Sequence, residues 1–290
     1  MGYENVISIQ ELQPHLDDSE WVVVDCRFSL ADTERGREDY LRNHIPGAVY
    51  AHLDEHLSGP VVPGETGRHP LPEIDAFCHT LSTWGISNDS QVVAYDDAGG
   101  AIAARLWWMM LWLGHDAVAL LDGGWPLWVA GGYPCHSGAE KRETSVFIPH
   151  PRPELAVSVS EVNRIRTDPE FRLVDAREAE RYRGEVEPID PVAGHIPGAL
   201  SVPYKENLDS TGCFLPSEKL RERYSDSLGD TSADRTVFYC GSGVTAAHSL
   251  VAMSHAGLGL GKLYLGSWSE WITDPNRLVA TRSSRADNRS

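Results

Sequence analysis

Basic residues are scarce in this sequence, which has 25 Lys and Arg against 42 Asp and Glu and a net charge of −17. Nucleic-acid-binding proteins carry a clustered excess of Lys and Arg, so the sequence excludes nucleic acid as a partner. A small anionic substrate would approach against the overall field of the protein, and its binding therefore requires a local positive site.

Long apolar runs are absent as well. The most apolar stretch, residues 101–113, is shorter than the ~20 residues that span a bilayer. The N-terminal residues show no basic region followed by an apolar stretch, so we expect no secretory signal. We therefore expect a soluble, cytoplasmic protein that does not bind a membrane.

Cysteines are few, and the five that are present form no Cys-x-x-Cys pair, so the sequence predicts no zinc or dithiol site. A disulfide framework is not expected in a chain of 290 residues, which favours a reducing compartment. The hydrophobic fraction of 41% is that of an ordinary globular protein. A chain of this length usually folds as about two domains.

The two halves of the chain repeat each other. Segments of the first half recur in the same order in the second, and the matched pairs are residues 21–27 with 171–177, 44–48 with 195–199, 92–96 with 236–240, and 123–128 with 266–271. Such ordered repetition indicates two copies of one fold. We predict a first domain at 1–140, a proline-stiffened linker at 141–155, a second domain at 156–282 and a tail at 283–290.

Each copy alternates short β-branched runs with helical stretches, which is typical of an α/β fold with a parallel sheet flanked by helices. Ligands of such sheets bind at the carboxyl ends of the strands. The sequence predicts a strand at residues 235–239 and a helix at 246–256. The segment between them, Cys-Gly-Ser-Gly-Val-Thr, is therefore a strand-to-helix loop at the edge of the sheet where chemistry is expected.

Cys240 begins this loop, which contains two glycines. Glycines allow the backbone to curl so that several N–H groups point to its centre and, with the dipole of the following helix, bind an anion. We expect Cys240 to be a thiolate in this setting, and the same N–H groups would stabilise a persulfide anion. A buried structural role is the alternative, which we assign to the other cysteines, Cys26, Cys78, Cys135 and Cys213.

The neighbours of the loop restrict its chemistry. Protein phosphatases with a comparable loop need an arginine six residues after the cysteine, and Ala246 stands there, so a phosphatase is disfavoured. In the first copy Asp96 stands at the position of Cys240, and an aspartate is a poor sulfur carrier, so this copy is predicted to be inactive. Residues that both copies share are expected to be structural, namely His44, His195, Asp25 and Asp175.

Together these features resemble the tandem-domain rhodanese family, and specifically its mercaptopyruvate and thiosulfate sulfurtransferases. The resemblance runs from about residue 21 to 271 and rests on both His-Ile-Pro-Gly-Ala segments, Trp107 and Trp108, the Cys240 loop and the motif at 266–271. It implies two rhodanese-like domains with the active site at the cleft between them. It also implies that Cys240 takes sulfur from a small anionic donor and passes it to a thiol, thioredoxin or cyanide, without a metal or other cofactor.

The resemblance also assigns site residues. The loop is similar to that of the mercaptopyruvate group, in which a serine, here Ser242, acts with a histidine and an aspartate that correspond by position to His69 and Asp54. Arg181 matches an arginine that binds the anionic donor. The remaining predicted donor-binding residues belong to the loop itself and are Gly241, Gly243, Val244 and Thr245.

One departure from the family pattern leaves the donor open. Where a second donor-binding arginine is expected, this chain has Asp190, as in thiosulfate-type members, and Arg183 or Arg68 is the candidate that compensates. We expect 3-mercaptopyruvate as the donor, with thiosulfate as the alternative. A persulfide carrier or redox-sensing module with little turnover is a third hypothesis.

Overall fold

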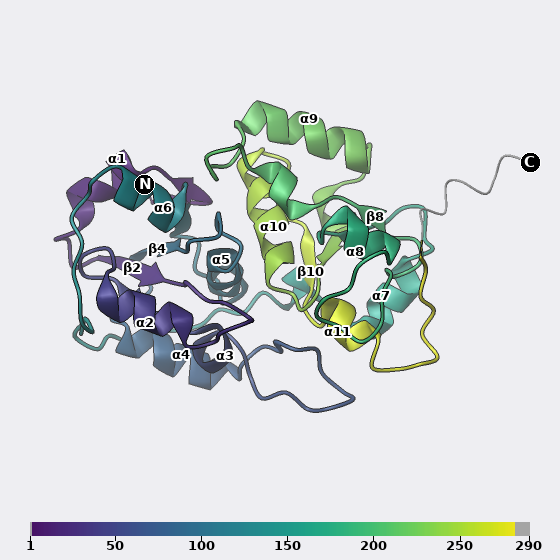
Figure 1. Ribbon diagram of the computed structural model, residues 1–290, viewed down its shortest axis with the longest axis horizontal. Coiled ribbons are helices and arrows are strands. Elements are labelled where there is room, and N and C mark those ends of the chain that lie inside the picture. The colour runs from purple at the N-terminus through teal and green to yellow at the C-terminus, as the bar shows by residue number, and fades with distance from the viewer. Residues whose placement is uncertain (1, 282–290) are drawn as a thin grey trace, which may run out of the picture. The chain divides into compact units, whose positions relative to one another are not determined.

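The computed structural model describes residues 2–281, and the predicted tail at 283–290 lies outside them. These residues form two compact units (Figure 1). The first contains residues 2–59, Leu71–Pro153 and Leu208–Leu215, and the second contains Pro60–Pro70, Glu154–Asn207 and residues 216–281. No helix within residues 2–281 has the length and apolar character that crossing a membrane requires.

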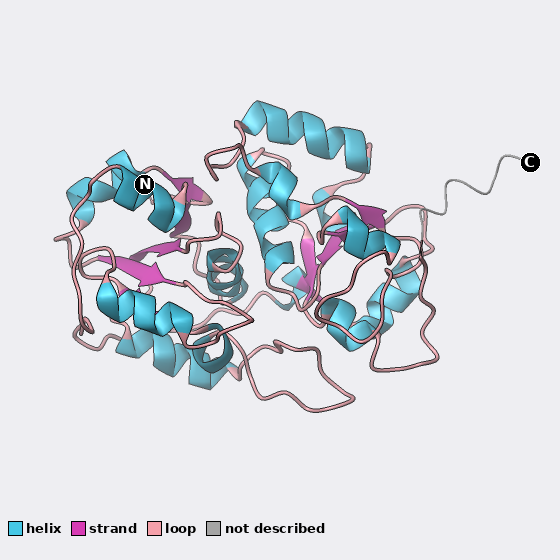
Figure 2. Cartoon of the chain, in the orientation of Figure 1, coloured by secondary structure: helices cyan, strands magenta, loops and turns pink. Residues whose placement is uncertain are grey.

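The first unit is a five-stranded parallel sheet with helices on both faces (Figures 1 and 2). In spatial order its strands are β1 (Val6–Ile7), β5 (Val118–Leu121), β4 (Gln91–Tyr95), β2 (Trp21–Asp25) and β3 (Val49–Tyr50). Its helices are α1 (Ile9–Leu12), α2 (Arg35–Arg42), α3 (Leu53–His56), α4 (Ile74–Thr83), α5 (Ala103–Trp112) and α6 (Gly124–Ala130), with a 3-10 turn at Gln13–His15.

Burial on both faces explains why the central strands are apolar throughout. Val23 and Val93 lie in one core with Leu12 of α1 and Trp128 of α6. Alternate strand residues point to the opposite face, which α5 covers. A parallel sheet covered on both sides selects continuous apolar strands rather than alternating ones, as the sequence shows here.

The second unit repeats this architecture. Its strands lie in the order β6 (Ala156–Val157), β10 (Lys262–Tyr264), β9 (Thr236–Tyr239), β7 (Arg172–Asp175) and β8 (Leu200–Ser201), all parallel. Its helices are α7 (Val159–Ile165), α8 (Ala179–Arg183), α9 (Ser217–Leu228), α10 (Thr245–His255) and α11 (Ser267–Trp271), with 3-10 turns at Pro153–Leu155, Tyr204–Asn207 and Ala233–Arg235. The predicted fold of two parallel sheets, each flanked by helices, is confirmed.

The repeated polar residues play the same structural part in both units. Asp25 and Arg27 form a buried ion pair with an N···O distance of 2.6 Å. Asp175 and Arg177 form the equivalent pair at the same distance. Since the pair occurs in the unit that lacks the cysteine as well, it serves the fold and not the chemistry.

Two short segments group with the unit that chain order would not assign to them. Pro60–Pro70 belongs to the second unit, although the first unit continues at Leu71. Leu208–Leu215 belongs to the first, and the amide of Phe214 donates to Asp122 Oδ1 at 2.9 Å. The sequence-based boundaries placed each segment in the other domain. A boundary predicted from sequence follows chain order, whereas the membership of a segment in a compact unit depends on its contacts in the fold.

Candidate active site

The predicted strand-to-helix loop is present in the second unit. Cys240 follows β9 directly, residues 241–244 form the loop, and α10 begins at Thr245, one residue before the predicted start. Gly243 has a φ of +74°, and a Cβ at this position would collide with the backbone carbonyl of Leu265. Only glycine therefore allows the loop to turn here.

Neighbouring residues fix the backbone of Cys240. Its N–H donates to Ser267 Oγ at 3.1 Å, and its carbonyl accepts from the Trp268 N–H at 3.0 Å. Ser267 in turn donates to the carbonyl of Tyr264 at 2.8 Å and has a φ of +53°, a strained value for a residue with a side chain. These contacts hold Cys240 with its side chain 1% exposed at the carboxyl end of the sheet.

The start of α10 supplies N–H groups for an anion. Within the described residues no side chain caps this eleven-residue helix at Val244, whereas Ser158 and Glu161 form a full capping box on α7. The first N–H groups of a helix need acceptors and carry the positive end of its dipole. Cys240 immediately precedes these N–H groups in the chain, and the prediction that they hold a persulfide on it stays a prediction.

The first unit shows how such a loop holds a negative charge. Asp96 stands where the second unit has Cys240, and its carboxylate accepts four backbone N–H groups at 2.7–2.9 Å. The donors are Ala98, Gly100, Ile102 and Ala103. Burial raises the pKa of Asp96, and these four hydrogen bonds oppose that shift. The loop of the first unit thus encloses its own carboxylate.

Ser242 and His69 are in contact. Ser242 Oγ lies 2.6 Å from His69 Nδ1, and both side chains are buried. The segment Pro60–Pro70 brings His69 into the second unit. Asp54 lies in α3 of the first unit, so its place beside this pair, and the predicted site at a cleft between domains, stay predictions.

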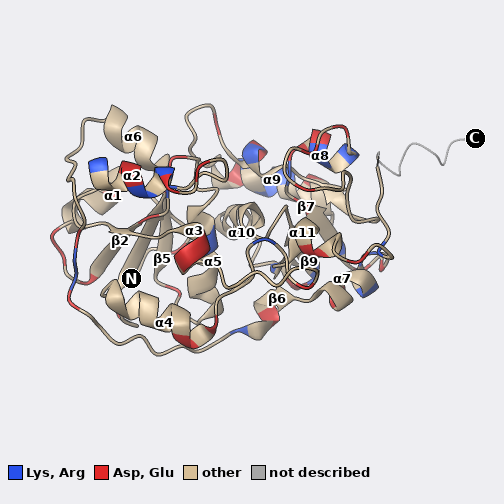
Figure 3. Ribbon diagram, turned by 60° about the horizontal axis from the view of Figure 1, so that its bottom comes forward, with Lys and Arg blue, Asp and Glu red and all other residues tan. Residues whose placement is uncertain are grey.

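Two arginines lie beside the cysteine loop. A Cβ built on Gly241 would lie 3.0 Å from Arg68 Nη2 and 3.7 Å from Arg181 Nη2. Asp190 accepts from both, at 2.6 Å from Arg68 Nη1 and 3.3 Å from Arg181 Nη2. Arg183, at the end of α8 among charged neighbours (Figure 3), pairs with a glutamate instead. Of the two candidates, Arg68 is therefore the one that lies beside the loop.

Sequence reasoning missed Glu187. Its carboxylate accepts from Arg181 Nη2 at 2.7 Å and Nε at 3.2 Å, and from Arg177 Nη1 at 3.2 Å. Burial raises the pKa of Glu187, but hydrogen bonds from Arg181 and from the Asp190 N–H outweigh burial, so the pKa is lowered. No motif marks Glu187, whereas Ser267 was visible in the repeat, because it replaces Gly124 of the first copy.

One group of side chains has the composition of a metal site. In the first unit Glu34, His52 and Glu55 place ligand atoms within 4.8 Å of one another. His52 Nδ1 accepts backbone N–H groups, however, and its Nε2 lies 3.0 Å from the carbonyl of Thr33. Both ring nitrogens are thus engaged, which leaves no lone pair for a cation.

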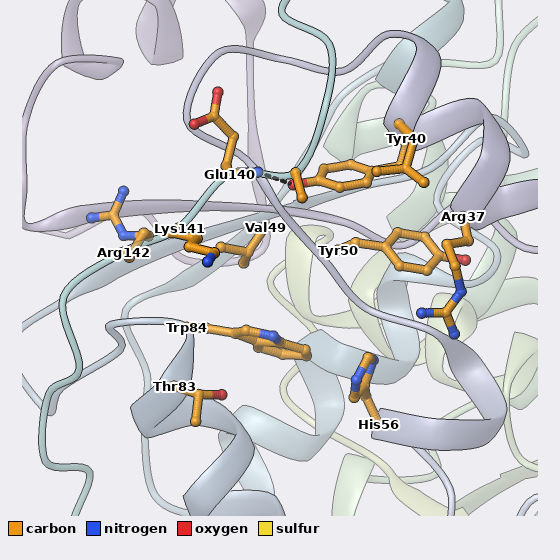
Figure 4. Close-up of a pocket in the computed structure, with 12 residues that line it drawn as sticks. Arg37, Tyr40, Val49, Tyr50, His56, Thr83, Trp84, Glu140, Lys141 and Arg142 are labelled. Carbon is orange, nitrogen blue, oxygen red and sulfur yellow. Dashed lines mark hydrogen bonds between the residues drawn. The ribbon is translucent and has the colours of Figure 1, made fainter.

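A cavity of about 490 Å³ lies in the first unit, and none of the predicted site residues is among those that line it. Figure 4 shows its aromatic walls, which Tyr40, Tyr50 and Trp84 form. The two tyrosine hydroxyls donate to backbone carbonyls, and Arg37 on its rim pairs with two glutamates. These contacts serve the fold of the first unit, so we do not assign the cavity to the reaction.

Known proteins resemble this chain over nearly its whole length. A model of the rhodanese-like domain matches residues 8–131 and 158–274. A probable 3-mercaptopyruvate sulfurtransferase of Pseudomonas aeruginosa is 48% identical over 282 residues, which cover 97% of this chain and 99% of that protein. A putative thiosulfate sulfurtransferase of Mycobacterium tuberculosis is 39% identical over 258 residues, 89% of each chain.

Solved structures agree with these sequence matches. The 3-mercaptopyruvate sulfurtransferase from Leishmania major has a TM-score of 0.80 and 33% sequence identity, over 92% of this chain and 73% of that one. The fold, the repeated motifs and the cysteine loop lead to the same assignment. This chain belongs to the rhodanese family and is one of its tandem-domain sulfurtransferases.

Proposed function

We propose that this protein is a 3-mercaptopyruvate sulfurtransferase in which Cys240 carries the transferred sulfur. The observation that supports this donor best is the 2.6 Å contact between Ser242 Oγ and His69 Nδ1. Ser242 lies in the same loop as Cys240, two residues after it. Breaking a carbon–sulfur bond needs a group that moves a proton, whereas carrying a persulfide does not. The relative from Pseudomonas aeruginosa bears the name of this activity.

In the first half-reaction the Cys240 thiolate attacks the sulfur of 3-mercaptopyruvate. A sulfur–sulfur bond forms, the carbon–sulfur bond breaks, and its electron pair stays on carbon as the enolate of pyruvate. The proton of the donor thiol passes to that carbon, so the products are a Cys240 persulfide anion and pyruvate. Ser242 and His69 stabilise the enolate oxygen and relay the proton, and the N–H groups of the loop hold the persulfide.

In the second half-reaction an acceptor attacks the outer sulfur of the persulfide. The sulfur–sulfur bond breaks, the acceptor keeps the sulfur, and Cys240 leaves as a thiolate. A thiol, a thioredoxin or cyanide can act as acceptor by this chemistry. The reaction needs neither a metal nor an organic cofactor, because the thiolate supplies the electron pair in each half-reaction.

Thiosulfate is the second candidate donor. Asp190 stands where a second arginine was expected, and the relative from Mycobacterium tuberculosis is named as a putative thiosulfate sulfurtransferase. Thiosulfate releases sulfite, a good leaving group that requires no proton. Use of thiosulfate should therefore not depend on Ser242, which gives a way to separate the two donors.

The test compares both donors on wild type and on Ser242→Ala. We expect kcat/KM for 3-mercaptopyruvate to exceed that for thiosulfate in the wild type. In Ser242→Ala it should fall about 100-fold for 3-mercaptopyruvate, since one proton-transferring group is worth about 10²–10⁴. For thiosulfate the change should stay within about threefold. Ser225→Ala, on the exposed face of α9, is the matched control.

Two results would reject this proposal. An equal loss with both donors would mean that Ser242 serves the loop and not the carbon–sulfur bond. Stoichiometric sulfur loading of Cys240 without turnover of either donor would identify a persulfide carrier.

A further inference from the structure

The backbone of Arg68 is fixed to the base of the cysteine loop. Its N–H donates to Ser269 Oγ at 3.0 Å, and the N–H of Ser269 donates to the carbonyl of Gly241 at 2.9 Å. All three residues belong to the second unit. The side chain of Arg68 therefore starts from a defined place next to the residue that follows Cys240.

One edge of the Arg68 guanidinium is engaged in a hydrogen bond. The other edge, Nε and Nη2, has no hydrogen-bond partner among the described residues, and we call it the open edge. Nη1 donates to Asp190 Oδ1 at 2.6 Å. Nε is buried and has no hydrogen-bond partner among the described residues, and Nη2 would lie 3.0 Å from a Cβ on Gly241. Nε and Nη2 together form the planar fork that binds a carboxylate through two parallel hydrogen bonds. A buried N–H without an acceptor is costly, which indicates that a ligand supplies one.

Arg181 differs from Arg68 in this respect. Glu187 already occupies its Nε–Nη2 fork, at 3.2 and 2.7 Å, and Asp190 also accepts from Nη2. Its Nη1 would lie 3.8 Å from a Cβ on Gly241. Arg181 therefore places a positive charge beside the loop, but its Nε–Nη2 fork is not available to a ligand. The arginine that the family pattern selects is thus not the one with the open edge.

Asp190 holds the guanidinium of Arg68 in its orientation beside Gly241. By accepting Nη1 of Arg68 and Nη2 of Arg181 it holds the two guanidinium groups together over Gly241. It also offsets one of their two positive charges, and Glu187 offsets the other, so the four side chains together are formally neutral. A group without net positive charge suits a donor with one carboxylate better than a doubly charged thiosulfate.

We propose that the Nε–Nη2 edge of Arg68 binds the carboxylate of the sulfur donor, and that Asp190 is the residue that positions it. This inference rests on the proposed function, because it names the residue that binds the carboxylate of the donor. Arg68 then acts as a binding residue of the reaction, and Arg181 adds charge from the second side.

The experiment varies the arginine and the donor carboxylate together. Wild type, Arg68→Met and Arg68→Lys are assayed with 3-mercaptopyruvate and with 1-mercapto-2-propanone, which has the same reacting atoms but a methyl group in place of the carboxylate. We expect Arg68→Met to lose about 10- to 100-fold in kcat/KM with 3-mercaptopyruvate, the value of one charge-assisted bidentate contact. With 1-mercapto-2-propanone it should change less than threefold. Arg68→Lys should also lose about tenfold, because an ammonium has no fork.

Two further variants complete the design. Arg183→Met removes an arginine of α8 that pairs with Glu185, and it should match wild type with both donors. Asp190→Asn should raise KM for 3-mercaptopyruvate with little change in kcat. It should also raise the ratio of thiosulfate to 3-mercaptopyruvate turnover, since it removes a negative charge; a merely structural role would not move this ratio.

The outcomes separate this inference from the proposed function. An Arg68→Met loss that is equal for the two mercapto donors, or no loss at all, would overturn the inference while 3-mercaptopyruvate remained the donor of the wild type. If the wild type does not turn over 3-mercaptopyruvate, the proposed function itself fails. Sulfur loading of Cys240 in Arg68→Met by thiosulfate, measured by intact mass, shows that the variant is folded.

Discussion

The loops that follow β4 and β9 occupy the same place in the two copies of the fold and begin with different residues. After β4 the carboxylate of Asp96 accepts four N–H groups of its own loop. After β9 the same position is Cys240, and the loop is two residues shorter, 241–244 against 97–102. The carbonyl of each residue accepts the N–H of an equivalent tryptophan, Trp125 or Trp268.

This difference shows which part of the site belongs to the fold and which to the residue. A parallel sheet with a helix after each strand produces an anion-binding loop in both units. In the first unit the acceptor is a carboxylate of the loop itself, so the loop contributes to stability. Under the proposed function the second loop holds a sulfur that gains and loses an atom, and the same device is catalytic.

Removing the sulfur should have the largest effect. Cys240→Ser leaves no group that forms a persulfide, and we expect the turnover of every donor to fall at least about 10³-fold, to the assay background. Its stability should stay within about 1 kcal/mol of the wild type, because the substitution replaces one atom in a loop. Steady-state assays and thermal unfolding measure the two quantities.

An exposed cysteine of the first unit provides the control for this variant. Cys135→Ser should keep full activity. Sulfur transfer that survives Cys240→Ser would mean that another cysteine carries the sulfur, and the contrast between the two loops would then have no catalytic meaning.

Removing the internal anion of the first unit should cost stability instead. Asp96→Ala leaves four N–H groups without their acceptor, and we expect a loss of at least about 3 kcal/mol in the free energy of unfolding, since each buried unpaired donor costs about 1–3 kcal/mol. Asp96→Asn keeps one acceptor oxygen and should lose about half as much. Denaturant unfolding measures both variants, with the exposed Asp89→Ala as control.

The activity of the same variants tests whether Asp96 has a structural role and not a catalytic one. At temperatures where Asp96→Ala is folded, its kcat should match the wild type, because the carboxylate of Asp96 accepts N–H groups of its own loop. A variant that keeps its stability but loses activity would contradict the structural role of Asp96.

The sequence was sufficient for the features that repeat or that depend on local geometry. The duplicated motifs located both sheets, and the alternation of strands and helices placed the loop after β9 to within one residue of the observed helix start. Cys240 could be chosen because its loop is contiguous in the chain, whereas Ser242 was chosen from the family pattern. These predictions depend on backbone conformation, which neighbouring residues determine.

Contacts between distant segments were beyond such reasoning. His69 was predicted from a family pattern, but nothing local shows that Pro60–Pro70 groups with the second unit. Asp190 appeared as a missing arginine, whereas in the fold it aligns Arg68 with Arg181. Pairing of this kind is decided by tertiary structure, so a single sequence reveals the residues but not which of them meet.

Acidification should have a smaller effect, and it distinguishes two matched histidines. His44 and His195 each place Nδ1 2.7 Å from a backbone carbonyl, and Glu140 Oε1 lies 3.5 Å from Nε2 of His44. Burial lowers the pKa of His195 from its usual value of 6.5. Below pH 6.5 the unfolded chain therefore binds a proton at His195 that the folded chain refuses, so stability is complete above pH 6.5 and declines as the pH falls.

The variants His195→Gln and His44→Gln test this assignment through thermal midpoints between pH 7.5 and 5. His195→Gln should be less stable than the wild type at pH 7.5, because it loses the contact with the carbonyl of Tyr182, but it should lose less further stability on acidification. His44→Gln should retain the acid-induced decline that His195 causes. If the wild type and His195→Gln show parallel pH profiles, His195 does not remain neutral in the fold.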